Sequence, residues 1–254
     1  MKTSGNTILI TGGSTGIGFA LADAFLKEGN RVIVCARSEE NLRIAKNRLP
    51  DLVTRSSDLS REVDRESLHE WVRSNFGDIN ILINNAGIQR TIDFKNGLAD
   101  LMKYRAMDGE DEIEINFSAY VYMAAYFIPE LLRKSEAAVV NVSSGLGFAP
   151  LAMMPVYCAT KAAIHSFTNS LRHQLKATSV HVFEASPPTT DTDLDESLAG
   201  EEEQAYRGIS PQEVAAKIIE GMKADKEQII VGEAQGLYQA ALRDPDAIFK
   251  QLND

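Results

Sequence analysis

The sequence predicts an α/β protein in which helices cover both faces of a parallel sheet. Short apolar runs rich in β-branched residues alternate with amphipathic runs along nearly the whole chain, as expected for strands joined by crossover helices. The 254 residues contain no internal repeat, low-complexity tract or Pro/Ser-rich linker that would mark a domain boundary. We therefore expect one domain over residues 1–254, a doubly wound Rossmann-type sheet of about seven parallel strands.

Strands are expected where β-branched and other apolar residues are densest. These segments are Thr7 to Ile10, Arg31 to Cys35, Leu52 to Arg55, Ile79 to Ile83, Ala138 to Val142, Val180 to Glu184 and Gln228 to Val231. Helices are expected where apolar residues recur at helical spacing. These segments are Gly16 to Lys27, Glu39 to Arg48, Val63 to Phe76, Ile113 to Arg133, Val156 to Lys176 and Pro211 to Met222. A helix follows each strand except the last, which is the connection that parallel strands need.

Two segments interrupt this alternation. Thr91 to Glu112 contains two glycines and a cluster of acidic residues, and we expect an irregular loop there. Asp191 to Glu203 contains seven acidic residues and no basic residue. It is either a solvated surface loop or a lid over a substrate site, because it follows the sixth strand at the carboxyl edge of the sheet.

The composition narrows the range of partners. The formal net charge of -10 and the lack of a basic run argue against nucleic acid and against anionic membranes. No apolar run reaches 18 residues, and no small-residue cleavage site follows Met1, so we expect a cytoplasmic protein. The two cysteines, Cys35 and Cys158, suggest neither a disulfide framework nor a metal site, and we expect no bound metal.

A glycine-rich turn, Thr11-Gly12-Gly13-Ser14-Thr15-Gly16-Ile17-Gly18, follows the first expected strand and opens the first helix. A dinucleotide needs close approach of the backbone to its pyrophosphate and a helix amino terminus directed at that charge, and such a turn supplies both. The turn alone is a weak indication, because glycines also occur by chance between a strand and a helix.

The end of the second expected strand bears on the choice of cofactor. Where an NAD site has a carboxylate for the ribose 2′-hydroxyl, this chain has Ala36 and Arg37. A small neutral residue followed by a guanidinium suits a 2′-phosphate, which favours NADP(H) over NAD(H). The alternative is that Arg37 is an exposed arginine at the start of a helix.

Ser144, Tyr157 and Lys161 suggest chemistry at a carbonyl group. Tyr157 and Lys161 are four residues apart in an expected helix, so their side chains lie on one face. The ammonium of Lys161 and an oxidised nicotinamide ring both favour the tyrosinate, which lets Tyr157 act as acid or base. Singly, each residue also fits a structural role: a buried aromatic, a strand-end hydroxyl and a surface lysine. Their joint spacing favours catalysis.

The motifs occur in a recognisable order along the chain: the glycine-rich turn, Asp58, Asn84-Asn85-Ala86-Gly87, Asn116, Ser144, and Tyr157 with Lys161. On these residues the sequence resembles the short-chain dehydrogenase/reductase family over essentially its full length. With Pro187 and Pro188 after the sixth strand, it is similar to a bacterial subgroup of mostly uncharacterised oxidoreductases. The resemblance implies that Asp58 and Leu59 flank the adenine ring, and that Asn116 binds a water in a proton relay through Lys161.

Residues and resemblance together define the expected site. The catalytic residues are expected to be Asn116, Ser144, Tyr157 and Lys161. The cofactor-binding residues are expected to be Gly12, Ser14, Thr15, Gly16, Ile17, Gly18, Arg37, Asp58, Leu59, Asn85, Ala86, Gly87, Tyr157, Lys161, Pro187, Thr190 and Thr192. Tyr157 would protonate the carbonyl oxygen, to which Ser144 would donate a hydrogen bond.

Some residues near these motifs depart from the family pattern or lie outside it. Pro188 stands where the family commonly has glycine, and it removes a backbone donor near the expected nicotinamide contact. Ser143 lies beside Ser144 but in the wrong register. His165 and His173 have no carboxylate partner in register on their helix, so we expect packing or surface roles for both.

These observations favour an NADPH-dependent reductase of a ketone or aldehyde, reversible as an alcohol dehydrogenase. The residues expected around the substrate are apolar, which suits a small or medium apolar carbonyl: Ile88, Phe94, Leu146, Phe148, Leu151, Met153 and Met154. One alternative is a non-catalytic NADP(H)-binding redox sensor, which binds the cofactor without oxidising it. Another is a structural module that binds no nucleotide.

The resemblance also implies a homodimer or homotetramer. The subunit contact would involve the two long helices, Ile113 to Arg133 and Val156 to Lys176. Several apolar residues on them fit either that contact or the core: Tyr120, Ala124, Phe127, Phe167 and Leu171.

Overall fold

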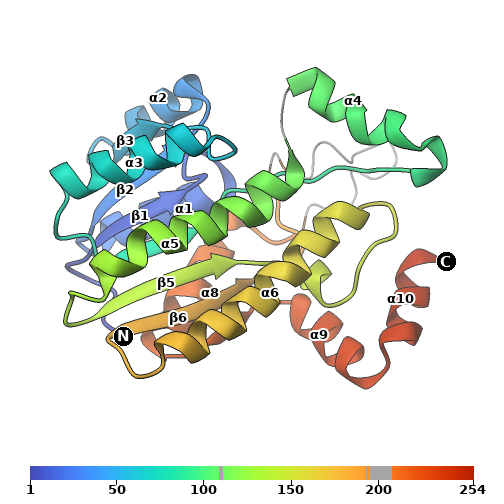
Figure 1. The fold of residues 1–254 in the computed structure, drawn as a ribbon. Helices are drawn as coiled ribbons and strands as arrows, with labels where there is room; N and C mark the ends of the chain where they lie inside the picture. Colours follow the sequence, from blue (N-terminus) through green and yellow to red (C-terminus); the bar gives the residue numbers. More distant parts are fainter. Residues whose placement is uncertain (109–110, 193, 195–207) are drawn as a thin grey trace.

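Seven parallel strands form a single sheet in the order β3-β2-β1-β4-β5-β6-β7 (Figure 1). The computed structural model describes residues 1–108, 111–192, 194 and 208–254. The strands are β1 (Thr7–Thr11), β2 (Arg31–Ala36), β3 (Val53–Ser56), β4 (Ile81–Asn84), β5 (Ala137–Val142), β6 (Val180–Ser186) and β7 (Gln228–Ile230). The predicted doubly wound α/β fold is confirmed.

Helices cover both faces of the sheet. One face is covered by α1 (Gly16–Lys27), α2 (Glu39–Arg48) and α8 (Pro211–Lys223), and the other by α3 (Glu62–Asn75), α5 (Ala119–Leu131) and α6 (Pro155–Leu175). Side chains alternate along β1, so Ile8 and Ile10 join the first layer and Leu9 joins the second. Because both faces are buried, each central strand is a continuous apolar run in the sequence.

The strand order reverses between β1 and β4, which are neighbours in the sheet although β2 and β3 lie between them in the chain. The segments that follow these two strands therefore leave in different directions. In open parallel sheets this point is where ligands bind, outside the carboxyl ends of the strands.

The segment Thr91 to Glu112 was wrongly predicted to be an irregular loop. It contains a 3₁₀ turn, η1 (Phe94–Asn96), and an α-helix, α4 (Leu98–Asp108). Leu, Ala, Met, Lys and Arg fill most of α4, and their helix propensity outweighs the acidic residues that suggested a loop. After α4, Asp111 accepts hydrogen bonds from two backbone N–H groups of the next helix, so one of those acids is a cap.

Two C-terminal helices were not predicted, α9 (Ala234–Arg243) and α10 (Pro245–Asn253). α9 packs against η3 (Gly145–Gly147), the 3₁₀ turn after β5. Asn253 of α10 accepts a hydrogen bond from the N–H of Ala152 and donates one to the carbonyl of Pro150. The C-terminal helices thus support the loop that joins β5 to α6.

The long helices contribute mainly to the core of this chain. Tyr120, Ala124, Phe127 and Leu171 are buried within it, and Phe167 is partly buried against the same apolar cluster. The structure therefore assigns these residues to the core rather than to an exposed contact face. The association of two or four chains stays a prediction.

Other predictions concern cysteines, metals and the acidic segment. Cys35 and Cys158 are both buried and free. Within the described ranges, no group of three or more His, Cys, Asp or Glu side chains could hold a metal ion, and no helix is long and apolar enough to cross a membrane. Most of Asp191 to Glu203 lies outside the described residues, so its two interpretations are not resolved by the fold.

Candidate active site

A cavity of about 450 Å³ opens at the carboxyl edge of the sheet, where the strand order reverses. Most of the predicted cofactor residues line it: Gly12, Ser14, Thr15, Gly16, Ile17, Arg37, Asp58, Leu59, Asn85, Ala86, Gly87, Tyr157, Lys161, Pro187 and Thr192. Gly18 and Thr190 do not line it. Gly18 shapes the turn, and Thr190 is buried, paired with Ile209 in a parallel bridge.

The turn after β1 brings the backbone close to the cavity. Gly12 and Gly16 have φ values of 63° and 53°, which glycine adopts without strain. A Cβ atom at Gly12 would lie 2.8 Å from Cα of Ala86, so only glycine fits against the chain after β4. α1 begins at Gly16, and its amino terminus is directed at the cavity lining. This arrangement fits the pyrophosphate of a dinucleotide.

Asn85 holds the turn in this shape. Its side-chain amide donates to the carbonyl oxygens of Thr11 and Gly12 at 3.0 and 3.2 Å. The hydroxyl of Thr11 accepts hydrogen bonds from the backbone N–H groups of Asn85 and Ala86. The ends of β1 and β4 are therefore locked together beneath the cavity.

Replacing Gly18 by Ala is expected to lower the free energy of unfolding by about 1–3 kcal/mol, the cost of overpacking. The new Cβ atom would overlap the carbonyl oxygen of Gly12 and lie 2.6 Å from Nδ2 of Asn85. Urea unfolding measures the change. Gly236→Ala is the control, because no atom lies within 4 Å of its added Cβ atom, and this change is expected to stabilise α9. Equal stability of Gly18→Ala and the wild type would contradict the packing.

Tyr157 and Lys161 lie on one face of α6, and both are buried, with 6% and 3% exposure. Nζ of Lys161 donates to the carbonyl of Val142 at 3.0 Å and lies 5.6 Å from the centre of the Tyr157 ring. Burial lowers the pKa of Lys161 to about 8, although the charge of Glu112 opposes that shift. The lysine is therefore a positive charge close to the phenol and able to exchange a proton near neutral pH.

Ser144 follows the last residues of β5. It is buried, and its hydroxyl accepts a hydrogen bond from the backbone N–H of Leu146, which caps η3. The lining of the cavity includes Ser143 rather than Ser144, so the predicted catalytic serine lies next to the cavity wall.

Asn116 lies in a π-helical turn, η2 (Glu114–Ser118), that precedes α5. It is fully buried, and its amide exchanges two 2.8 Å hydrogen bonds with the backbone of Ile88 and donates a third to Thr160. These bonds compensate for the poor helix propensity of asparagine, and π turns often mark functional sites. A Cβ atom at Gly87 would lie 3.3 Å from Oδ1 of Asn116 and 3.6 Å from Nζ of Lys161. The glycine thus leaves the space between these two groups open.

Glu112 was missed by the sequence analysis, which grouped it with other acids in a loop. It is 6% exposed, and neither carboxylate oxygen has a hydrogen-bond partner of good geometry. Burial raises the pKa of Glu112 to about 7, an effect that the charges of Arg90 and Lys161 and the backbone N–H of Arg90 only partly offset. Its spacing of four residues from Asn116 could have indicated a place on the same helix face.

His165 and Ser143 both contact a carboxylate that the sequence analysis did not connect with them, and His165 also packs on the ring of Phe148. Nδ1 of His165 lies 2.7 Å from Oε2 of Glu184, a carboxylate supplied by β6 rather than by the same helix. Ser143 lines the cavity and donates to Oε1 of the same carboxylate at 2.7 Å. His173 is exposed, as predicted.

The predicted apolar substrate residues do not all gather at the cavity. Only Ile88 lines it. Leu146, Leu151 and Met154 pack around Tyr157 and Cys158, whereas Phe148 packs on the rings of His165 and Tyr238. Phe94 and Met153 are 58% and 48% exposed.

Comparison of the sequence with known proteins places the chain in a family. Residues 6–203 match the family model described as short chain dehydrogenase. The chain belongs to the short-chain dehydrogenase family. It is 48% identical over 253 residues to the protein named "Uncharacterized oxidoreductase DltE" of Bacillus subtilis (strain 168), covering 100% of this chain and 98% of that relative. This short-chain dehydrogenase is accordingly an oxidoreductase.

Solved structures of short-chain dehydrogenases have the same fold. One from Burkholderia cenocepacia J2315, in complex with NADP, has a TM-score of 0.83 at 26% identity and covers 99% of both chains. One from Sphingobium yanoikuyae, in complex with NADPH, has a TM-score of 0.77 at 26% identity and covers 94% of this chain and 96% of that one. One from Burkholderia phymatum, in complex with NAD, has a TM-score of 0.82 at 19% identity, covers 100% of this chain and 97% of that one, and supports the fold alone.

Proposed function

We propose that this short-chain dehydrogenase is an NADPH-dependent reductase of a ketone or aldehyde, acting reversibly on the alcohol. The observation that carries the proposal is the pair Tyr157 and Lys161, buried on one face of α6 and lining a cavity beside the glycine turn. An acid with its own positive charge, next to a cavity lined by the glycine turn, suits reduction of a carbonyl group.

Each catalytic residue has a distinct part in this chemistry. Bound NADPH would supply the hydride that reduces the carbonyl carbon. Tyr157 donates its phenolic proton to the carbonyl oxygen, and the ammonium of Lys161 stabilises the tyrosinate that remains. Ser144 donates a hydrogen bond to the same oxygen, which favours the charge that develops there.

Lys161 returns a proton to Tyr157, and a water bound by Asn116 would pass a proton from solvent back to Lys161. With a pKa lowered to about 8, Lys161 gives up a proton more readily than a surface lysine. Asn116 fixes the backbone of Ile88 and, across Gly87, lies close to the same ammonium.

Arg37 supports NADPH as the preferred cofactor. It lines the cavity together with Ala36, Ser38 and Asn41, at the end formed by β2 and the start of α2. This end lies beyond the glycine turn from Tyr157, where the ribose of the adenosine half would bind. Two of the structural relatives above were solved with NADP or NADPH.

Replacing Arg37 by Ala is expected to weaken NADPH binding about 10- to 100-fold, because charge-assisted hydrogen bonds to the 2′-phosphate are lost. NADH binding should stay unchanged. Fluorescence titration of both cofactors measures the effect, with Arg43→Ala as control, since Arg43 is exposed on α2 and paired with Glu40. Equal weakening of NADPH and NADH would show that Arg37 does not recognise the phosphate.

The test of the reaction itself is oxidation of NADPH by a panel of ketones, aldehydes and quinones. Turnover with any of them supports the reductase. Ile88, the predicted apolar residue that lines the cavity, favours a substrate without charge on that side.

A further inference from the structure

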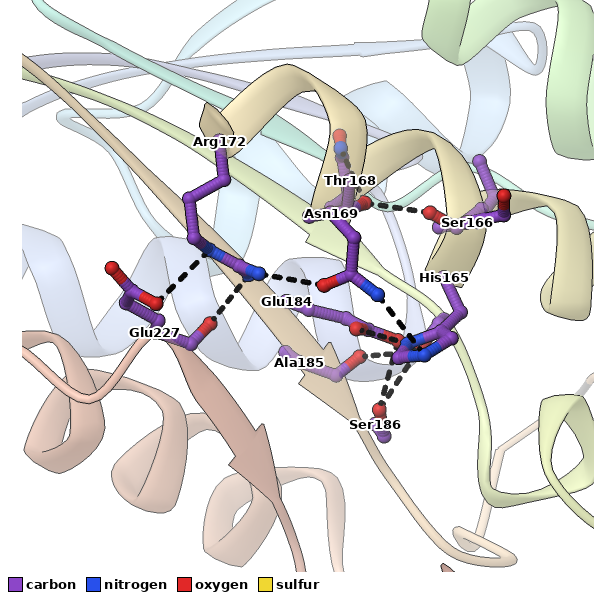
Figure 2. Close-up of polar contacts among 12 residues, drawn as sticks. His165, Ser166, Thr168, Asn169, Arg172, Glu184, Ala185, Ser186 and Glu227 are labelled. Carbon is purple, nitrogen blue, oxygen red and sulfur yellow. Dashed lines mark hydrogen bonds and ion pairs between the residues drawn. The ribbon is translucent and has the colours of Figure 1, made fainter. Parts of the chain in front are cut away.

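A chain of polar side chains runs from the surface of α6 to Glu184 and Ser186 of β6 (Figure 2). It continues to Ser143, which lines the cavity. Its members come from three parts of the fold: Arg172, Asn169 and His165 from α6, Glu184 and Ser186 from β6, and Ser143 from the end of β5. Glu184 is the centre of the chain, and its side chain is fully buried. Burying a carboxylate removes it from water, which is unfavourable unless hydrogen bonds replace those to water. The hydrogen bonds to Glu184 are therefore expected to stabilise it in this position.

From Arg172 to Glu184, each hydrogen bond has a fixed donor and acceptor. Arg172 can only donate, so the group it contacts at 2.7 Å is Oδ1 of Asn169. Nδ2 of Asn169 then faces Nε2 of His165 at 3.1 Å and must donate to it. Nε2 is therefore an acceptor, and the ring proton lies on Nδ1, which donates to Oε2 of Glu184 at 2.7 Å.

The inner half points toward Glu184 from the other side. The hydroxyl of Ser143 donates to Oε1 of Glu184 at 2.7 Å. Because its proton is used there, Ser143 accepts the hydroxyl proton of Ser186 at 2.8 Å. Both arms thus donate toward the carboxylate oxygens of Glu184.

The residues held by Glu184 are neighbours of the catalytic and cofactor residues. Ser143 precedes Ser144, Ser186 precedes Pro187, and His165 lies one helical turn after Lys161. Backbone bonds join the same segments, since Ser143 donates to the carbonyl of Ala185 at 2.8 Å and Gly145 to that of Pro187 at 3.0 Å. Glu184 therefore contacts every element that carries a proposed catalytic group except the one with Asn116.

We propose that Glu184 is a positioning residue that fixes the ends of β5 and β6 against α6 through Ser143, Ser186 and His165. It touches neither substrate nor cofactor and acts through Ser144 and Pro187. The effect of Glu184 on catalysis rests on the proposed function. Its effect on the ends of β5 and β6 is independent of that function.

Glu184→Gln tests the direction of the chain, because glutamine has the same shape but one oxygen is replaced by a donor. If its NH₂ faces His165, two donors meet. If its NH₂ faces Ser143, the hydroxyl of Ser143 must exchange its 2.7 Å bond to the carboxylate for the carbonyl of Ala185 at 3.4 Å. Either way a short buried hydrogen bond is lost or weakened, which should lower local stability about tenfold.

The readouts are measured with and without cofactor. In the protein without cofactor, amide hydrogen exchange at Ser143, Gly145 and Val231 should accelerate about tenfold in Glu184→Gln. These N–H groups donate to the carbonyls of Ala185, Pro187 and Ser186 and so report on both strand ends. The dissociation constant for NADPH should rise about tenfold as well, because Ser143 and Pro187 line the cavity.

Asn169→Asp provides the rescue. The introduced carboxylate would accept from both Arg172 and a protonated Nε2 of His165, so Nδ1 of His165 becomes an acceptor for the NH₂ of the introduced glutamine. The side-chain oxygen of that glutamine then accepts from Ser143 as before, and every donor is satisfied. The double variant Glu184→Gln/Asn169→Asp should therefore return exchange and NADPH binding close to wild type.

Any of three outcomes would contradict the positioning role of Glu184. The first is wild-type hydrogen exchange in Glu184→Gln, and the second is a double variant that behaves like Glu184→Gln alone. The third is an equal effect of the control His173→Gln, at an exposed site on α6. If Glu184→Gln does not fold, folding of the double variant supports the proposal, and its failure overturns it. If the wild type binds no NADPH while exchange is accelerated and rescued, the proposed function falls and the positioning role stands.

Discussion

Replacing Tyr157 by Phe is expected to lower kcat by about 10²- to 10⁴-fold, the usual contribution of a general acid. The phenylalanine fills the same buried site between Met154 and Cys158, so the fold and the cavity should be retained. NADPH binding should change little, because phenylalanine keeps the ring that lines the cavity and leaves the other cofactor-binding residues in place. Steady-state NADPH oxidation and fluorescence titration measure the two quantities separately.

Tyr122→Phe is the matched control for this variant. Tyr122 is 45% exposed on α5 and stacks on the guanidinium of Arg65, away from the cavity. Its loss of a phenolic hydroxyl should leave kcat unchanged. A Tyr157→Phe enzyme with wild-type kcat would show that another group delivers the proton.

Replacing Glu112 by Gln is expected to stabilise the protein at high pH and much less at low pH. The unfolded carboxyl has a pKa near 4.5, whereas burial raises the pKa of Glu112 in the folded protein to about 7. The protonated form is thus favoured by folding, so its stabilising contribution is complete below about pH 4.5 and is lost as pH rises through about 7. Between pH 5 and pH 8 the free energy of unfolding of the wild type should therefore fall by about 2–3 kcal/mol. The free energy of unfolding of the glutamine variant should not show this fall.

Urea unfolding of both proteins at pH 5 and pH 8 measures this difference. Glu70→Gln is the control, because Glu70 is exposed on α3 and its carboxylate is solvated in both states. The same pH dependence of stability in the wild type and in Glu112→Gln would contradict a buried carboxyl with a raised pKa. Stabilisation of the variant at pH 5 rather than at pH 8 would reverse the sign and contradict it equally.

The fold could be predicted because its determinants are local. Strands such as Ile81–Asn84 are buried on both faces and appear as apolar runs, and the amphipathic segments between them must be crossovers. The same holds for the glycine turn and for Tyr157 with Lys161, whose spacing within one segment fixes their geometry. α4 was missed because acidic residues were weighed above helix propensity, and α9 and α10 because the prediction stopped at the last strand.

The remaining site features depend on contacts between distant segments. Glu184 and His165 are in contact because β6 lies beneath α6. The spacing of residues along α6 shows only which residues of that helix are neighbours, so it could not reveal a partner on β6. Glu112 looks like a solvated acid in the sequence, and only the packing near Arg90 and Cys158 buries it. Phe94 and Met153 were expected at the substrate site on hydrophobicity alone, although their exposure depends on how η1 and the loop before α6 are placed.

The central claim, that this short-chain dehydrogenase reduces a carbonyl group with NADPH, is tested most directly by NADPH oxidation with purified protein. The absorbance of NADPH is followed with ketones, aldehydes and quinones, and NADH is run in parallel. The account predicts oxidation with at least one carbonyl and a lower KM for NADPH than for NADH. Tight binding of NADPH with no oxidation by any compound would contradict it and favour the redox sensor, and the lack of any nucleotide binding would contradict the cofactor site itself.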